Sequence, residues 1–290
     1  MERREKAEFS RPVTTIIQSR SSWRSYRSRP LEPELRDRIR GYLQGLTTGP
    51  FGHTTRYQLI EKDDPAVFDN TNLGTYGFIK NARNFIAGAV EIGVHHWEDY
   101  GYNLEKTILK MTELGLGTCW LGGTFRRSEF ATLLKIRKNE VIPAVTPVGY
   151  GTNRRSIRDR IIRRGAKSRT RKPWEWLFFD ARFAEPLSEA AAGEYAAALE
   201  MVRLAPSASN RQPWRVVKDG DNFHFCLKRS RNYSEMFKAA DLQRVDMGIA
   251  MCHFELTVRD AGLSGEWIAC PPEIDLPELV EYIITWQTKV

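Results

Sequence analysis

The segment APSASNRQPW, residues 205–214, combines the features of a helix end and a strand start. Residues 195–202 before it place apolar side chains on one helical face, and Pro206 favours an end to that helix. The residue before Pro213 is biased away from the helical conformation, so residues 215–218 are expected to form a strand. By composition alone the segment is a polar loop, whose short side chains can bond to the backbone or to a ligand.

The same order of elements occurs earlier in the chain. Residues 33–46 carry a helical stripe of apolar side chains, with Pro33 in the first turn, where proline is favoured. The glycine-containing loop TTGPFGHTT follows, and then a predicted strand at residues 56–60. Residues 46–59 align without gaps with residues 204–217. The chain therefore contains two versions of one helix, loop and strand unit, which indicates an internal repeat.

A second pair of matching segments lies further on in each copy. GYNLEKTILKMTELGLGTCW, residues 101–120, aligns with GIAMCHFELTVRDAGLSGEW, residues 248–267. The identical pairs are Gly101/Gly248, Leu109/Leu256, Gly115/Gly262, Leu116/Leu263 and Trp120/Trp267. Both segments contain a predicted helix that is apolar on several sides, which is typical of a helix buried on several sides. We therefore predict an α+β fold of two related α/β halves, residues 1–180 and 181–290, that share a core.

The net charge of +8 comes from one basic strip. Residues 153–172 hold ten basic side chains against one acid, Asp159, so the rest of the chain is close to neutral. A nucleic-acid or membrane-surface binder is disfavoured, because such a protein spreads its charge over a face and the strip has no aromatic side chain to stack on a base. We expect a solvated helix face and no nucleic-acid partner, with an anionic partner as the alternative.

The cysteines and histidines show no spacing typical of metal ligands. The four cysteines form no CxxC pair and the five histidines form no HExxH motif. Scattered cysteines fit the reduced thiols of a cytosolic protein. No segment approaches the roughly 20 apolar residues of a membrane helix, and residues 1–10 lack the apolar run of a signal peptide. We expect a cytoplasmic protein without a metal site and without membrane contact.

Residues 205–214 resemble the signature P-S-x-x-N-x-Q-P-W of the FMN-dependent nitroreductase family. In that family the loop lies against FMN at a subunit interface. The resemblance implies that Pro206, Ser207 and Asn210 contact the flavin. It extends from about residue 19 to residue 267 and implies a nitroreductase-like fold.

The segment RSSWRSY, residues 20–26, is similar to a motif near the N-terminus of that family. If the segment is extended, Arg20, Ser22 and Arg24 point to one side. Two guanidiniums and a hydroxyl suit a phosphate, because arginine presents forked donors to oxyanions. The resemblance implies that these residues hold the FMN phosphate, whereas the residues alone also fit a solvated basic arm.

The segment GLGTCWLGGTF, residues 115–125, contains two groups of glycines. The first group fits an ordinary helix end, whereas Gly122 and Gly123 permit close approach of a planar ligand. The family has a matching stretch near the pyrimidine edge and N5 of the flavin. The resemblance implies that Leu121, Gly122 and Gly123 contact the cofactor, and that Arg169 and Arg171 in RTRKP reach its phosphate.

The chain departs from an ordinary nitroreductase because its motifs are divided unequally. The first half has TTGPFGHTT in place of the P-S-x-x-N-x-Q-P-W loop. The second half has WIAC, residues 267–270, in place of WLGG, and no arginine motif before its first helix. The chain resembles the TM-type branch of the family. We therefore expect a fused pseudo-dimer, monomeric or assembled further into a homo-oligomer, with one FMN between its halves.

The resemblance implies an FMN-dependent NAD(P)H oxidoreductase with ping-pong hydride transfer through flavin N5. NADH or NADPH would be the donor, and a nitroaromatic, a quinone or a similar small-molecule oxidant the acceptor. We assign no catalytic side chain, because the cofactor carries the chemistry and the sequence shows no nucleophile and base pair. The alternative is a flavin-binding protein without turnover, for sensing or storage.

Overall fold

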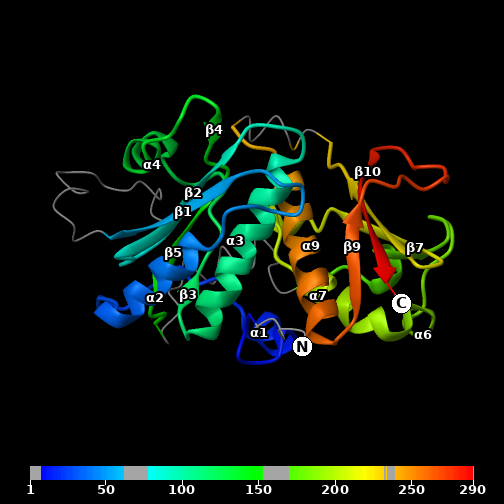
Figure 1. Ribbon diagram of the computed structural model, residues 1–290, viewed down its shortest axis with the longest axis horizontal. Helices are drawn as coiled ribbons and strands as arrows, with labels where there is room; N and C mark the ends of the chain where they lie inside the picture. Colours follow the sequence, from blue (N-terminus) through cyan, green and yellow to red (C-terminus); the bar gives the residue numbers. More distant parts are fainter. Residues whose placement is uncertain (1–7, 62–77, 153–169, 232, 234–238, 290) are drawn as a thin grey trace, which may run out of the picture.

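The computed structural model describes residues 8–61, 78–152, 170–231, 233 and 239–289 (Figure 1). The helices are α1 (Val13–Ser19), α2 (Pro33–Gln44), α3 (His96–Glu113), α4 (Arg127–Leu134), α6 (Glu189–Ala192), α7 (Ala196–Leu204) and α9 (Leu242–Asp260). Short 3₁₀ turns are η1 (Trp174–Trp176), η2 (Gly193–Tyr195) and η3 (Ala208–Asn210). Most of the basic strip, residues 153–169, lies outside the described residues, so its predicted helix face is not tested.

The strands form two sheets with the same internal order. The strands are β1 (Thr55–Glu61), β2 (Asn84–Glu91), β3 (Gly117–Thr118), β4 (Glu140–Val141), β5 (Val145–Gly149), β6 (Phe178–Asp180), β7 (Trp214–Asp219), β8 (Asn222–Lys228), β9 (Ser264–Ile268) and β10 (Val280–Lys289). The first sheet runs β1-β2-β5-β3 and the second runs β7-β8-β10-β9, in both cases with antiparallel neighbours. The short β4 adds to β2, and β6 adds to the edge of β7 in parallel.

This correspondence supports the predicted internal repeat. Each half passes from a helix through a loop into its first strand, then through the second strand into a long helix and two more strands. The predicted helix at residues 33–46 is α2, and the strands predicted at residues 56–60 and 215–218 are β1 and β7. The α+β class with two related halves is therefore confirmed.

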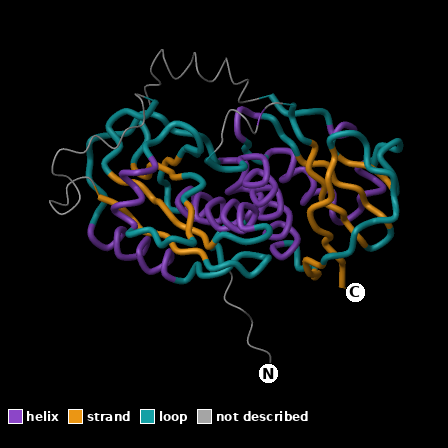
Figure 2. The backbone as a smooth tube through the Cα atoms, turned by 90° about the horizontal axis from the view of Figure 1, so that it is seen from above, coloured by secondary structure: helices purple, strands orange, loops and turns teal. Residues whose placement is uncertain are grey.

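Helices α3 and α9 pack against each other between the two sheets, as Figures 1 and 2 show from two directions. Helix α9 is buried along almost its whole length, and its first turn is capped by Asp241, whose side chain accepts a hydrogen bond from the backbone N–H of Arg244. Helix α3 is also buried on several sides, but it carries polar groups inward, among them Asp99 and Glu105. The core shared by the halves is therefore a helix pair with buried polar contacts.

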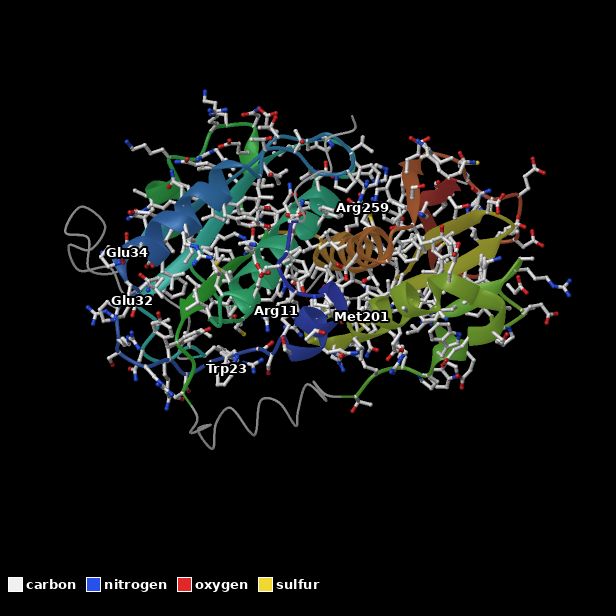
Figure 3. All side chains as sticks on the ribbon, turned by 60° about the horizontal axis from the view of Figure 1, so that its bottom comes forward. Arg11, Trp23, Glu32, Glu34, Met201 and Arg259 are labelled. Atoms are coloured by element: carbon white, nitrogen blue, oxygen red, sulfur yellow. The ribbon has the colours of Figure 1, made fainter. Side chains whose placement is uncertain are left out.

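Two segments before residue 181 pack with the second sheet. Helix α1 contributes Val13, Ile16 and Ile17 to the core that contains α7 and α9, and Figure 3 shows its segment, with Arg11 labelled, beside α7, where Met201 is labelled. Strand β6 joins β7 directly. The predicted domain boundary between residues 180 and 181 stays a prediction. Helix α1 and strand β6 precede that boundary in the chain but pack with the second half. Within the described residues, no helix combines the length and apolar character of a membrane span.

Candidate functional site

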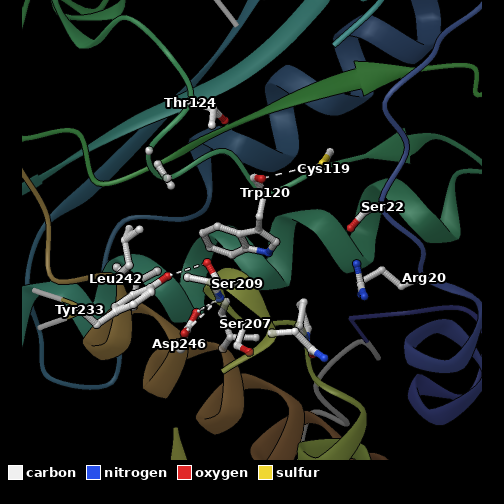
Figure 4. Close-up of a pocket in the computed structure, with 18 of the residues that line it drawn as sticks. Arg20, Ser22, Cys119, Trp120, Thr124, Ser207, Ser209, Tyr233, Leu242 and Asp246 are labelled. Carbon is white, nitrogen blue, oxygen red and sulfur yellow. Dashed lines mark hydrogen bonds between the residues drawn. The ribbon is translucent and has the colours of Figure 1, made fainter. Parts of the chain in front are cut away.

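A cavity of about 240 Å³ lies between the two halves. Its walls come from the segment after α1, the loop after β3, the loop after α7 and the start of α9 (Figure 4). These segments are far apart in sequence, so only the tertiary fold brings them together. The cavity includes these predicted site residues: Arg20, Ser22, Arg24, Gly122, Gly123, Arg171, Pro206, Ser207 and Asn210.

The segment after α1 runs as an extended chain along the first sheet. Trp23 donates its backbone N–H to the carbonyl of Thr118 at 2.7 Å, and Ser22 pairs with the same residue. The indole of Trp23 packs where side chains on Gly117 and Gly151 would collide with it. Because alternate residues of an extended segment point to opposite sides, Arg20, Ser22 and Arg24 line the cavity.

One end of the cavity is positively charged, because arginine side chains line it. Arg171 donates to the carbonyl of Leu204 at 2.9 Å and to Oδ1 of Asn210 at 3.3 Å. Burial, with a smaller contribution from the nearby positive charges of Arg20 and Arg203, lowers the pKa of Arg171 to about 10. Guanidiniums held close together in a buried site favour an anion between them. Arg169, also predicted for this role, lies outside the described residues.

The loop of residues 205–214 keeps its shape through its own polar groups. Ser209, Asn210 and Gln212 have φ angles of 50°, 54° and 49°, which few non-glycine residues adopt. Asp246 at the start of α9 accepts the backbone N–H of Ala208 at 2.9 and 3.1 Å, one distance for each carboxyl oxygen. The Ser207 hydroxyl accepts the N–H of Gln212 at 2.9 Å, and its own proton remains available to donate.

The glycine pair after Trp120 has a packing role as well as a place in the cavity. A Cβ on Gly122 would lie 2.7 Å from Cδ2 of Leu242, so this glycine lets α9 approach the loop. Leu121, predicted as a cofactor contact, does not line the cavity. It is buried in the core of the first sheet, and its backbone exchanges two hydrogen bonds with Val145, of 2.9 and 3.0 Å. Its apolar side chain therefore belongs to the core.

Comparison with known proteins agrees with this architecture. The family model described as "Putative TM nitroreductase" matches residues 12–258. The chain belongs to this family. It is therefore an oxidoreductase of nitroreductase type. No curated protein matches the chain.

Among solved structures, a "putative nitroreductase" from Thermotoga maritima is similar over both full lengths. The match covers 99% of this chain and 98% of that one, at 18% identity and a TM-score of 0.62, which shows a common fold. An "FMN-dependent Nitroreductase" from Clostridium difficile matches 49% of this chain and 88% of its own, at 21% identity and a TM-score of 0.38. The match to a "putative nitroreductase in complex with fmn" from Desulfovibrio desulfuricans covers 52% of this chain and 95% of that one, at 22% identity and a TM-score of 0.39.

Several lining residues of this nitroreductase chain were not predicted from the sequence. Trp120 could have been found, because it is identical to Trp267 in the repeat and lies within the glycine-containing segment of residues 115–125. No sequence motif points to Asp246, Tyr233 or Leu242, because each is a single residue outside the segments that resemble the family. Burial raises the pKa of Asp246 well above its ordinary value, because the charged form of the carboxyl is poorly solvated there.

The nitroreductase repeat also creates a second cavity, of about 260 Å³, beside the loop after α2. Its lining includes Trp267, the counterpart of Trp120, and Tyr102, which stands where the first site has Ile249. Asp99, the counterpart of Asp246, accepts the N–H groups of Phe51 and His53 at 2.8 and 2.9 Å. The remaining lining residues are Gly45, Leu46, Thr47, Thr48, Gly49, Pro50, Asn103, Lys106 and Glu255. The arginines of the first cavity have no counterpart among them.

Proposed function

We propose that the first cavity binds one FMN per chain and that the protein is an NAD(P)H-dependent flavin oxidoreductase. When bound, FMN supplies hydride transfer at its N5 atom. The protein would bind NADH or NADPH and then a nitroaromatic, a quinone or a similar oxidant in the same open site, in a ping-pong order. The observation that carries the proposal is the convergence of Arg20, Arg24 and Arg171 with the loop of residues 205–214 in one cavity between the halves.

The arginine end of the cavity suits the phosphate of the cofactor. Burial lowers the pKa of Arg171, and repulsion from the nearby charge of Arg20 adds to this shift. A phosphate between them would replace that repulsion with charge-assisted hydrogen bonds. Ser22 adds a hydroxyl on the same wall. The donor set therefore fits a tetrahedral dianion better than it fits a neutral ligand.

The other end of the cavity suits a planar ring. Gly123 has no side chain to fill the space, and Trp120 and Ile249 give apolar surface. Ser207 has a hydroxyl proton to donate, and Asn210 lines the same wall. A ring edge with both donors and acceptors can be bound by such a mixture of apolar surface and a few polar groups.

The unequal cavities favour one cofactor per chain. The second cavity lacks the arginines, and Tyr102 bonds through its hydroxyl to Glu255 at 2.9 Å where the first cavity is lined by Ile249. The second cavity is lined by one lysine, Lys106, and one carboxyl, Glu255, so it offers a phosphate less positive charge than the three arginines of the first cavity. We propose that the two halves act as a pseudo-dimer and that the chain functions as a monomer.

The experiment is a measurement of flavin stoichiometry and oligomeric state. Protein purified with excess FMN and then freed of unbound flavin is expected to show flavin absorbance and to release one FMN per chain on heating. Light scattering during gel filtration is expected to give the mass of one chain. Release of two FMN per chain, or of none, would contradict the single site.

A second candidate is a flavin-binding protein without turnover, because one of the two related cavities has lost its arginines. Anaerobic titration with NADH and NADPH separates the candidates. Bleaching of the bound flavin, followed by its return on addition of a nitroaromatic or a quinone, is expected for the oxidoreductase. Flavin that neither nucleotide reduces would favour the sensing or storage role.

A further inference from the structure

Glu105 lies in the middle of α3 and is fully buried behind the wall of the first cavity. Its Oε2 accepts the indole N–H of Trp120 at 2.6 Å. Its Oε1 lies 2.9 Å from Nε2 of His253 in α9 and 3.7 Å from Nε of Arg20. One carboxyl therefore joins three segments that the sequence separates: the arginine segment, the loop after β3, and the central helix of the second half.

His253 fixes Glu105 from the side of the second half. Its Nδ1 lies 2.8 Å from the carbonyl oxygen of Met201 in α7. A carbonyl oxygen only accepts hydrogen bonds, so Nδ1 carries a proton and Nε2 is directed at Glu105. Both side chains are fully buried. The orientation of the Glu105 carboxyl is therefore set by a partner that is not among the residues lining the cavity.

The other two partners of Glu105 both line the cavity. Figure 4 shows Trp120 and Arg20 at the cavity, on the wall formed by the first half. Arg20 approaches Glu105 through Nε, which leaves the two terminal nitrogens of its guanidinium further from the carboxyl. These nitrogens form the fork that binds oxyanions. The Trp120 indole donates its single N–H to Glu105, which restricts the positions that its ring can take.

We propose that Glu105 is the positioning residue of the flavin site. It holds the guanidinium of Arg20 for the cofactor phosphate and the indole of Trp120 as a wall of the cavity. The proposal rests on the proposed function, because it assumes that the cavity binds FMN through its phosphate. It concerns the protein before the cofactor binds, so binding to the flavin-free protein tests it without any assay of turnover.

The second half supplies a matched control. Glu255 in α9 accepts the indole N–H of Trp267 at 2.7 Å and the hydroxyl of Tyr102 at 2.9 Å, and it pairs with Arg259. It is also buried between the helices, but it borders the second cavity, which has no arginine cluster. A substitution at Glu255 therefore disturbs a similar network without reaching the first cavity.

The test compares FMN with riboflavin, which differs from FMN only in lacking the phosphate. Glu105→Gln keeps the size of the side chain and an oxygen to accept from Trp120, but it removes the charge that orients Arg20. Affinities are measured by flavin fluorescence with flavin-free protein. We expect Glu105→Gln to weaken FMN binding about tenfold and to change riboflavin binding less than about twofold, since coupled groups at one site interact at this level. Glu255→Gln should leave both affinities unchanged.

Each outcome decides between the alternatives. Removal of a negative charge would by itself strengthen anion binding, so unchanged or tighter FMN binding by Glu105→Gln would overturn the positioning role. If the wild-type protein binds FMN no better than riboflavin, the proposed phosphate site fails instead. If Glu105→Gln does not fold, as judged by circular dichroism, Trp120→Phe and Trp267→Phe replace it. We expect Trp120→Phe to lose riboflavin affinity and Trp267→Phe to keep it. Equal losses of riboflavin affinity in the two variants would overturn the proposal.

Discussion

Gly101 of α3 and Gly248 of α9 mark a reciprocal helix crossing. A Cβ on Gly101 would overlap the carbonyl of Val245, and a Cβ on Gly248 would overlap the carbonyl of Glu98. Val245 and Glu98 each stand three residues before the glycine of their own helix. Such an exchange of equivalent contacts is expected of a two-fold interface between identical subunits. Here the interface lies inside one chain, so the core shared by the two halves depends on these two glycines.

Gly101→Ala and Gly248→Ala are each expected to destabilise the protein by on the order of 1–3 kcal/mol, because an added methyl group forces the two helix backbones apart. Denaturant unfolding measures the change. Gly41→Ala in α2 is the control, because no atom lies within 4 Å of its added Cβ. That variant should be neutral or slightly stabilised through helix propensity. Equal effects at the three positions would show that the crossing is not tightly packed.

Arg24→Ala is expected to weaken FMN binding by about 1.5–3 kcal/mol, because it removes a charged donor from the phosphate end of the cavity. Equilibrium titration of the flavin-free protein measures the change. His53→Ala is the control, since His53 stands in the loop that replaces the flavin motif in the first half. Its FMN content should equal that of the wild type. A comparable loss in His53→Ala would argue against a single site.

Asp246→Ala is expected to lower both stability and FMN affinity, because the backbone N–H of Ala208 loses its acceptor and the flavin loop loses its anchor. The cost to stability is about 1 kcal/mol. Asp246→Asn should behave like the wild type, because burial favours the uncharged form of the native carboxyl and an amide has a similar shape. Thermal unfolding and FMN titration test both variants. An asparagine variant as damaged as the alanine variant would imply an ionised Asp246.

Asp99 is expected to give the protein a measurable dependence on pH. Burial raises its pKa from 3.8 to about 6, although two backbone N–H groups oppose the shift. The folded protein therefore binds more protons at Asp99 than the unfolded chain between these two values. The stabilising contribution of protonated Asp99 is fully present below about pH 4, is lost as the pH rises to about 6, and amounts to about 3 kcal/mol.

The Asp99→Asn variant isolates this effect. The free energy of unfolding of the wild type, relative to the variant, should fall between about pH 4 and pH 6 and then stay level. Denaturant unfolding at a series of pH values gives the difference directly. A relative stability that stays level between pH 4 and pH 6 and falls as the pH drops below about 4 would mean that the two backbone hydrogen bonds outweigh burial and that the pKa of Asp99 is lowered.

Much of the site could be predicted because its parts are short local motifs. The arginine segment is extended, so alternation alone places Arg20, Ser22 and Arg24 on one side. The loop of residues 205–214 keeps its shape mainly through contacts within itself and with α9. Leu121 shows the limit of this reasoning, because its neighbours Trp120 and Gly122 line the cavity whereas Leu121 turns into the core.

The repeated elements and the loop that resembles a flavin site could be predicted from local sequence patterns. Helical periodicity, proline positions and the spacing of short motifs depend on residues close along the chain, so they can be read directly. The tertiary structure alone decided that α1 and β6 pack with the second sheet, that Glu105 meets His253, and that Arg20 lies near Arg171. These contacts join residues far apart in the chain, and they form only when burial of α3 against α9 brings the two halves together.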